Sequence, residues 1–232
     1  MNETASAMPA SDQFPLPFQH QPAFAAVDFL AAASNQAALT WLERSADWPD
    51  HRLALWGEAG CGKTHLLHVW AARAGAVRWE GAALHGLPKL PTKGGIALDT
   101  ADAAEEITLL HLLNSAAEAR LPLLLVSRTP PARWPVRLPD LASRLRAITA
   151  VEIAPPEESL LQALLLRLLA DRQLAVGATL QEWLLRRLPR SPAALREAVA
   201  RLDRAALAEG GAITRPLAAR VLAEMQGGAL EE

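Results

Sequence analysis

The sequence has little that would tie it to an oxidising compartment or to a membrane. Its 232 residues include one cysteine, Cys61, so no disulfide can form within the chain and a reducing compartment fits best. No apolar run approaches the ~20 residues that cross a bilayer. The N-terminus has neither the basic nor the apolar region of a signal peptide. We therefore expect a cytoplasmic protein that makes no membrane contact.

An excess of charge of one sign is also lacking. The formal net charge is −2, which argues against a protein that holds nucleic acid mainly through a basic surface. The only lysines are Lys63, Lys89 and Lys93, and this arginine bias fits genome composition better than a binding surface. Hydrophobic residues make up 51% of the chain and charged residues 21%. This is a globular composition, with length for one α/β core and a smaller second unit.

One stretch carries a specific motif. Residues 57–64 read GEAGCGKT and fit G-x-x-x-x-G-K-[ST], the phosphate-binding P-loop. The apolar segment 52–56 before it predicts a buried strand, and 65–72 after it has the apolar spacing of a helix. The alternative is a glycine-rich turn that carries Lys-Thr by chance.

The motif assigns a role to each of its residues. Backbone N–H groups of the loop and of the helix start would surround phosphates. Lys63 would reach the β/γ-phosphate oxygens, and the Thr64 hydroxyl would ligate Mg²⁺. We therefore predict ADP or ATP with Mg²⁺ as ligands, held by Ala59, Gly60, Cys61, Gly62, Lys63, Thr64 and His65.

A second apolar segment, 95–99, ends in an acid as a Walker B strand does. The Asp99 carboxylate would hold Mg²⁺ beside Thr64, whereas the plainer interpretation is an acid that starts an ordinary turn. Thr100 follows, at the position where hydrolysing relatives carry a second acid that orients the attacking water. Asp102 and Glu105 are other carboxylates that could serve, so hydrolysis by this chain itself is left open.

The rest of the first 155 residues alternates between strands and helices. We expect strands at 76–79, 121–127 and 151–153, and helices within 25–48 with Ser34 as N-cap, at 103–120 and at 138–146. Along one face of the 103–120 helix lie Ile107, Leu110, His111 and Asn114. Ser127 either faces the γ-phosphate or simply ends its strand. The alternation predicts a parallel sheet with helices on both faces.

After Pro156 only helical patterns occur. A broad leucine face within 160–169 and further helices at 180–188, 192–208 and 216–225 predict a small bundle packed against the nucleotide edge. We therefore expect three parts: an arm at 1–22, an α/β nucleotide-binding domain at 23–155 and a helical lid domain at 156–232. In the arm, Pro15 and Pro17 exclude a helix. Its apolar Phe14, Leu16 and Phe18 would pack on the domain itself or dock on a partner.

These features together describe an AAA+ ATPase core, and four segments make the resemblance more specific. Phe24 with Asp28-Phe29, the Ser34-Asn35 pair with Ala38, the His65-Leu-Leu after the P-loop, and LPDLASRL at 138–145 resemble the DnaA family. The resemblance covers essentially the whole chain. It extends to DnaA-related regulators that inactivate the initiator and, like this sequence, lack the N-terminal partner domain and C-terminal DNA-binding domain of DnaA.

The resemblance implies further site residues. Arg144 matches the arginine finger, which acts across a subunit interface; Arg146 is the alternative, and a plain surface arginine the simpler interpretation. Arg196 matches the sensor-2 arginine, which reaches the nucleotide from a lid helix. Gln13, Phe14, Leu16 and Phe18 resemble the peptide by which relatives dock on the β sliding clamp, with Phe14 in place of the usual leucine.

The implied partners are the β sliding clamp, DnaA and, through the clamp, DNA, and a homodimer is a further arrangement. We therefore expect a regulator of chromosomal replication initiation that presents Arg144 to ATP held by DnaA and so prevents re-initiation. Whether the chain is itself an enzyme stays open. The alternatives are a stand-alone AAA+ ATPase of the helicase-loader type, a P-loop kinase of a small molecule, and a clamp-associated module without initiator control.

Overall fold

A computed structural model describes residues 30–86 and 89–227 of the chain. The predicted clamp-binding residues Gln13, Phe14, Leu16 and Phe18 lie outside these ranges. The α-helices of the described residues are α1 (Gln36–Glu43), α2 (Lys63–Ala74), α3 (Glu106–Glu118), α4 (Pro139–Ala147), α5 (Glu158–Asp171), α6 (Ala178–Arg187), α7 (Pro192–Glu209) and α8 (Arg215–Gly227).

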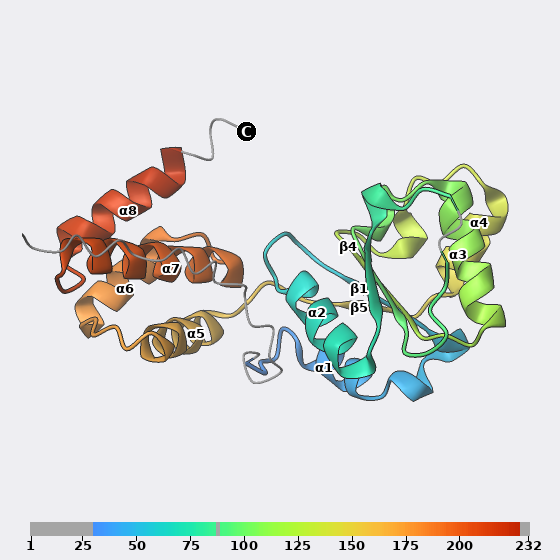
Figure 1. Cartoon of the computed structure of the whole chain (residues 1–232), viewed down its shortest axis with the longest axis horizontal. Helices are drawn as coiled ribbons and strands as arrows, with labels where there is room; N and C mark the ends of the chain where they lie inside the picture. The colour runs from blue at the N-terminus through green and yellow to red at the C-terminus, as the bar shows by residue number, and fades with distance from the viewer. Residues whose placement is uncertain (1–29, 87–88, 228–232) are drawn as a thin grey trace, which may run out of the picture.

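A five-stranded sheet forms the centre of the α/β unit, in the order β2-β3-β4-β1-β5 (Figure 1). Every neighbouring pair is parallel, as predicted. The central strand β4 is buried along its whole length, as its continuous apolar run indicates. The strands are β1 (Arg52–Trp56), β2 (Val77–Glu80), β3 (Ile96–Asp99), β4 (Leu123–Ser127) and β5 (Ala150–Glu152).

The strand order reverses at β1. From β1 the chain crosses to β2 at the far edge, returns through β3 and β4 to pair with β1, and then places β5 on the other side of β1. Ligands of open α/β sheets bind outside the carboxyl ends of the strands at such a reversal. The loop after β1 is the predicted P-loop, so topology and motif point to the same place.

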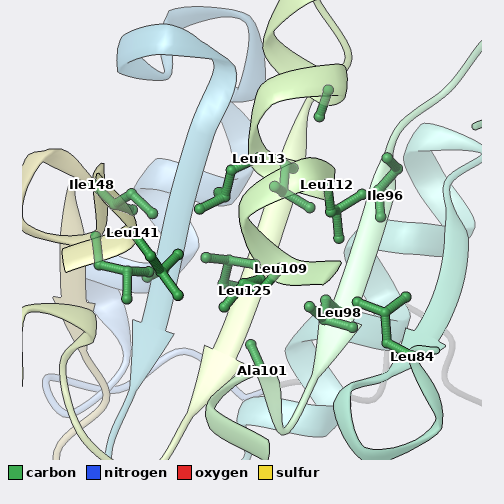
Figure 2. Close-up of a cluster of buried hydrophobic side chains, with 14 of the residues drawn as sticks. Leu84, Ile96, Leu98, Ala101, Leu109, Leu112, Leu113, Leu125, Leu141 and Ile148 are labelled. Atoms are coloured by element: carbon green, nitrogen blue, oxygen red, sulfur yellow. The ribbon is translucent and has the colours of Figure 1, made fainter. Parts of the chain in front are cut away.

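Two apolar layers cover the sheet because alternate strand residues face opposite sides. Leu123 and Leu125 pack with α3 and α4 in one cluster, whereas Leu124 and Val126 pack with α1 and α2 in the other. Figure 2 shows the first cluster, in which Leu109, Leu112 and Leu113 of α3 point toward the strands. Helices on both faces confirm the predicted α/β class.

The side of α3 that packs on the sheet is not centred on the face that carries Ile107, Leu110, His111 and Asn114. The helix buries Leu109, Leu112, Leu113 and Ala116, whereas Ile107 is 55% exposed. Apolar residues at 107, 109, 110, 112 and 113 form an arc wider than one face. Sequence periodicity alone did not fix which part of that arc meets the sheet.

The predicted N-cap at Ser34 was wrong. Asn35 is the N-cap residue of α1, and its side chain makes no capping hydrogen bond. The Ser34 backbone N–H and hydroxyl instead donate to the two carboxylate oxygens of Glu157, at 2.8 and 2.9 Å. Glu157 immediately precedes α5, so this contact joins the start of α1 to the start of the helical unit.

Helices α5 to α8 form that helical unit around an apolar core of their own. Leu195, Val199 and Leu202 of α7 are buried in it, and the half-buried Leu30 packs against it. Among residues 30–86 and 89–227, we find no helix with both the length and the apolar character that a membrane crossing requires.

Candidate nucleotide site

The P-loop is built from backbone that only glycine accommodates. Gly57 has a φ of 153°, and a Cβ added there would lie 2.4 Å from the carbonyl oxygen of Ile153, just after β5. Gly60 has a φ of 80°, and its Cβ would lie 2.6 Å from the Cβ of Ser191 in the helical unit. The loop is therefore held tightly between the end of the sheet and the residue before α7.

Lys63 folds back on this loop. Its Nζ donates to the carbonyl oxygens of Gly57 and Glu58 at 2.8 and 2.7 Å, and the residue is buried. The Cys61 Sγ lies 3.7 Å from the same Nζ. The ammonium thus links the start of α2 back to the first residues of the loop.

Helix α2 begins within the motif with uncapped amides. Gly62 is its N-cap, with a left-handed backbone and no side chain to accept from the first turn. The N–H groups of Lys63, Thr64 and His65 therefore stand at the helix N-terminus without intrahelical partners. The His65 side chain is buried, so its contribution to an anion site would come from the backbone. Ala59 is exposed at the loop surface.

Thr64 and Asp99 line one open cavity of about 420 Å³ beside the loop. A hydroxyl and a carboxylate at this place suit Mg²⁺, which takes one or two protein oxygens and completes its shell with phosphate and water. One Asp99 oxygen, Oδ1, accepts from the Thr100 N–H at 2.8 Å. The two predicted metal ligands are thus brought together.

The same cavity is lined by residues that sequence analysis did not assign. They are His68 from α2 and Arg78, Trp79 and Glu80 from β2. Arg78 lies 2.9 Å from His68 Nδ1. Burial, and then the Arg78 charge, lower the pKa of His68, whereas Asp99 raises it. The cavity is therefore lined by the positive charge of Arg78 and by the carboxylates of Glu80 and Asp99.

Glu80 and Thr100 are joined across neighbouring strand ends. Glu80 is the β-partner of Asp99, and the Thr100 hydroxyl donates to Glu80 Oε1. Thr100 has a φ of 43°, a conformation that β-branched residues rarely adopt. A Cβ at Gly81 would lie 2.1 Å from the Thr100 carbonyl oxygen, so the two backbones touch here.

The other polar groups considered near this edge have different partners. Asp102 lines a separate cavity of about 140 Å³ with Trp134. Glu105 Oε2 accepts from the Thr108 hydroxyl at 2.8 Å. The Ser127 hydroxyl donates to the Thr129 carbonyl at 2.7 Å, which fits a strand end. None of these three residues lines the cavity of Thr64 and Asp99.

Arg196 lies on α7, five residues after Ser191. Five residues of helix rise by roughly 7.5 Å, and Ser191 touches Gly60 of the P-loop. The Ser191 hydroxyl also caps α7 by accepting from the Ala194 N–H at 3.1 Å. Arg196 therefore lies in the second turn of the helix whose N-cap residue contacts the P-loop.

Arg144 lies at the opposite end of the sheet. Helix α4 leads into β5, whose first residue, Ala150, pairs with Ala54 of β1. Arg52 is the first residue of β1. Burial lowers the pKa of Arg52, the Asp50 charge raises it, and the nearby Arg144 charge lowers it further. The P-loop follows the last residue of β1, so the length of that strand, roughly 16 Å, separates Arg144 from its own P-loop.

Glu106 fixes the start of the helix that carries Arg144. Its carboxylate oxygens accept from the backbone N–H groups of Arg137, at 2.9 and 3.0 Å, and Leu138, at 2.9 Å. These bonds, with the Arg137 charge, lower the pKa of Glu106, although burial opposes them. Leu138 is the N-cap of α4. Arg144 Nε lies 3.4 Å from Oδ1 of Asp140, one turn earlier on α4. Arg146 is exposed.

The sequence contained a partial signal for Glu80. The apolar pattern predicted a strand at 76–79, whereas β2 extends through Glu80. A carboxylate at a strand end is informative only when the neighbouring strand is known. The pairing of β2 with β3, which sets Glu80 beside Asp99, comes from the fold.

A scan against protein-family models finds no match, and a search of curated proteins finds no significant relative. Solved structures do match. Domain III of the Thermotoga maritima replication initiation protein DnaA superposes with a TM-score of 0.72 at 16% identity, over 88% of this chain and 97% of that one.

Larger proteins contain the same fold. A DnaA structure with AMPPCP and single-stranded DNA matches with a TM-score of 0.63 at 15% identity, over 77% of this chain and 64% of the DnaA chain. The Thermotoga maritima RuvB Holliday junction branch migration motor matches with a TM-score of 0.62 at 18% identity, over 82% and 67%. At such identities the likeness concerns the fold. The chain has the AAA+ fold, in the form that DnaA domain III adopts.

Proposed function

We propose that this chain is a regulator of chromosomal replication initiation of the Hda type, a DnaA-related protein that inactivates the initiator. It binds ADP or ATP with Mg²⁺ at the P-loop. It docks on the β sliding clamp through residues 13–18 and contacts DNA only through the clamp. It presents Arg144 to ATP held by DnaA and so activates the ATPase of its partner.

The nucleotide part of the proposal fits the residues at the site. The uncapped amides of α2 and the Lys63 ammonium would hold phosphate oxygens, and Thr64 with Asp99 would hold Mg²⁺. A DnaA of the same fold has been solved with AMPPCP, a nucleotide analogue. Arg196, near the contact between Ser191 and Gly60, would report the bound nucleotide to the helical unit.

The observation that carries the regulatory part is the position of Arg144. Its own P-loop lies at the other end of β1, so a role for this guanidinium at a phosphate requires a second protein. Its side chain is 37% exposed and pairs with the exposed Asp140 one turn earlier, and partly exposed pairs of this kind contribute little to stability. A guanidinium supplied across an interface raises phosphoryl-transfer rates by about 10³–10⁵-fold in other systems.

The test is single-turnover hydrolysis of ATP preloaded on DnaA, with clamp loaded on DNA. We expect the wild-type chain to accelerate hydrolysis and Arg144→Ala to lose that acceleration by roughly 10³-fold. Arg146→Ala is the matched control on the same helix, and it also decides which arginine is the finger. The triple variant Gln13→Ala/Leu16→Ala/Phe18→Ala should lose the part of the acceleration that requires the clamp loaded on DNA.

Urea unfolding of Arg144→Ala serves as the control for folding. We expect a change within about 0.5 kcal/mol, because the side chain is partly exposed and its loss relieves repulsion with Arg52. An unchanged rate on DnaA with the wild-type chain would contradict the regulatory proposal.

A second candidate is a stand-alone ATPase of the helicase-loader type, and the similarity to the RuvB motor favours it. It predicts steady ATP turnover by the isolated chain, lost on Lys63→Ala, with no contribution from residues 13–18. Deletion of residues 1–22 therefore separates the two candidates.

A further inference from the structure

We propose that Glu80 is the carboxylate that orients and deprotonates the attacking water when this chain hydrolyses its own bound ATP. The inference rests on the proposed nucleotide binding at the P-loop. It goes beyond the regulatory role, because it makes the chain itself an ATPase whose water-activating carboxylate is supplied by β2. Its product would be the ADP form of the regulator.

The first argument is placement. Glu80 ends β2 at the carboxyl edge of the sheet, directly opposite Asp99 in the parallel register. It lines the cavity that also holds Thr64 and Asp99, the two residues suited to Mg²⁺. Glu80 and Asp99 are the acidic residues of that cavity. Glu80 therefore faces the space in which the phosphate end of a nucleotide on the P-loop would lie.

The second argument is that the local backbone holds Glu80 there. Thr100 adopts a left-handed backbone that is unfavourable for a β-branched residue, and in that conformation its hydroxyl donates to Glu80 Oε1. Such strain costs about 1–3 kcal/mol and concentrates at functional sites. Gly81 has no Cβ and lets the Thr100 carbonyl approach the β2 end. One carboxylate oxygen is thus held by Thr100, while the residue stays exposed to solvent.

The third argument concerns the division of roles between the two acids. The Thr100 N–H bond to Asp99 Oδ1 orients that carboxylate for a cation. Thr100 therefore holds both acids, one through its N–H and one through its hydroxyl. Thr100 directly follows β3, at the position where hydrolysing relatives carry a second acid, and the neighbouring strand β2 supplies an acid at the same edge of the sheet.

The chemical step balances with these groups. As the water oxygen forms its bond to the γ-phosphorus, the bond between that phosphorus and the β,γ-bridging oxygen breaks. Glu80 accepts the water proton and later releases it to solvent. The products are ADP and inorganic phosphate, and no further reactant is needed. General bases of this kind contribute about 10²–10⁴-fold to rates.

The experiment uses the full chain without DnaA or clamp. Binding of AMPPCP is measured first by calorimetry, and hydrolysis of preloaded [γ-³²P]ATP with Mg²⁺ is then followed in a single turnover. We expect wild-type protein to convert its ATP to ADP, and Glu80→Gln to do so roughly 100-fold more slowly. The AMPPCP affinity of Glu80→Gln should stay within about threefold of wild type, which separates the chemical step from binding.

Two kinds of control sharpen the result. Glu152→Gln changes the exposed glutamate that ends the other edge strand, β5, outside the cavity, and it should hydrolyse as wild type does. Thr100→Val removes the hydroxyl but keeps the branched shape, so we expect a roughly tenfold loss. Thr100→Ser should restore the rate, because it retains the donor. Equal rates for the valine and serine variants would overturn the positioning role of Thr100.

The remaining outcomes distinguish this inference from the proposed function. A wild-type chain that binds AMPPCP but does not hydrolyse ATP overturns the role of Glu80 and leaves the regulatory proposal intact. Equal hydrolysis by wild type and Glu80→Gln also overturns it. A wild-type chain that binds no nucleotide overturns both.

Discussion

The two ends of the parallel sheet present opposite kinds of chemistry. At the carboxyl end, the tightly packed P-loop with the buried Lys63 precedes a cavity that is lined by Thr64 and by the paired acids Glu80 and Asp99. At the amino end, Arg52 and Arg144 place two positive charges near each other, and Arg144 is partly exposed. In the proposed function the carboxyl end is the receiving end, which holds phosphate and Mg²⁺, whereas the amino end presents Arg144 to a partner.

This separation suggests why one small α/β unit can serve two sites. Helix α4 runs back from the carboxyl end, where Glu106 holds its start, to the amino end, where it carries Arg144. A nucleotide at one end and a guanidinium at the other cannot meet within one chain. In the proposed function the two meet when a second AAA+ protein, DnaA, stacks against this one.

The largest expected effect is the loss of nucleotide binding at the receiving end in Lys63→Ala. The ammonium holds the Gly57 and Glu58 carbonyls and would contact phosphate, so its removal should weaken ADP binding by roughly 10³-fold, about 4 kcal/mol. Fluorescence titration with a labelled ADP measures this. Lys93→Ala, at an exposed position, is the matched control. Equal weakening by both variants would contradict a specific role for Lys63.

A smaller effect should follow when the backbone of the receiving end is altered. Gly57→Ala forces a Cβ to within 2.4 Å of the Ile153 carbonyl, and we expect a loss of about 3 kcal/mol in the free energy of unfolding. Gly75→Ala, at the other end of α2, meets no atom within 4 Å and should lose only about 1 kcal/mol, for its left-handed backbone. Urea unfolding compares the two, and equal losses would argue that the P-loop is not specially constrained.

The receiving end was predictable from sequence to the extent that its signals are local. The P-loop, its strand and its helix occupy one continuous segment, so their spacing alone predicted β1 and the start of α2. Asp99 was predicted for the same reason, as an acid that ends an apolar run, and it does end β3. The sequence did not point to Glu80 as a candidate site residue, because its position beside Asp99 depends on the pairing of β2 with a strand that begins sixteen residues later.

The errors elsewhere have the same physical origin. Ser34 has the side chain of an N-cap, but a carboxylate 123 residues away competes for its hydroxyl. In α3 the apolar arc was wide enough for several orientations, and the surface of the sheet selected the one that buries Leu109 and Leu112. Arg144 could be assigned only by resemblance, since its sequence surroundings do not show at which end of the sheet it lies. Long-range contacts decide these cases, and local patterns do not encode them.

The smallest expected effect concerns Glu106, which links the two ends through α4. Its hydrogen bonds from the Arg137 and Leu138 N–H groups lower its pKa, below the ~4.3 of an unfolded glutamate. Because the folded pKa is the lower one, this carboxylate stabilises the fold fully above the unfolded pKa. The stabilisation is lost as the pH falls through the folded pKa. Glu106→Gln should therefore be less stable than wild type at pH 7, and the difference should shrink below about pH 4.

Urea unfolding of both proteins between pH 7 and pH 3 measures that difference. Glu118→Gln, at the exposed end of the same helix, is the control and should show no such pH dependence. If the difference between Glu106→Gln and wild type does not change with pH, the carboxylate does not hold α4 through its charge. The direction in which Arg144 is offered would then depend on the apolar contacts of Leu141 and Leu145 alone, which are buried under α3 and the sheet.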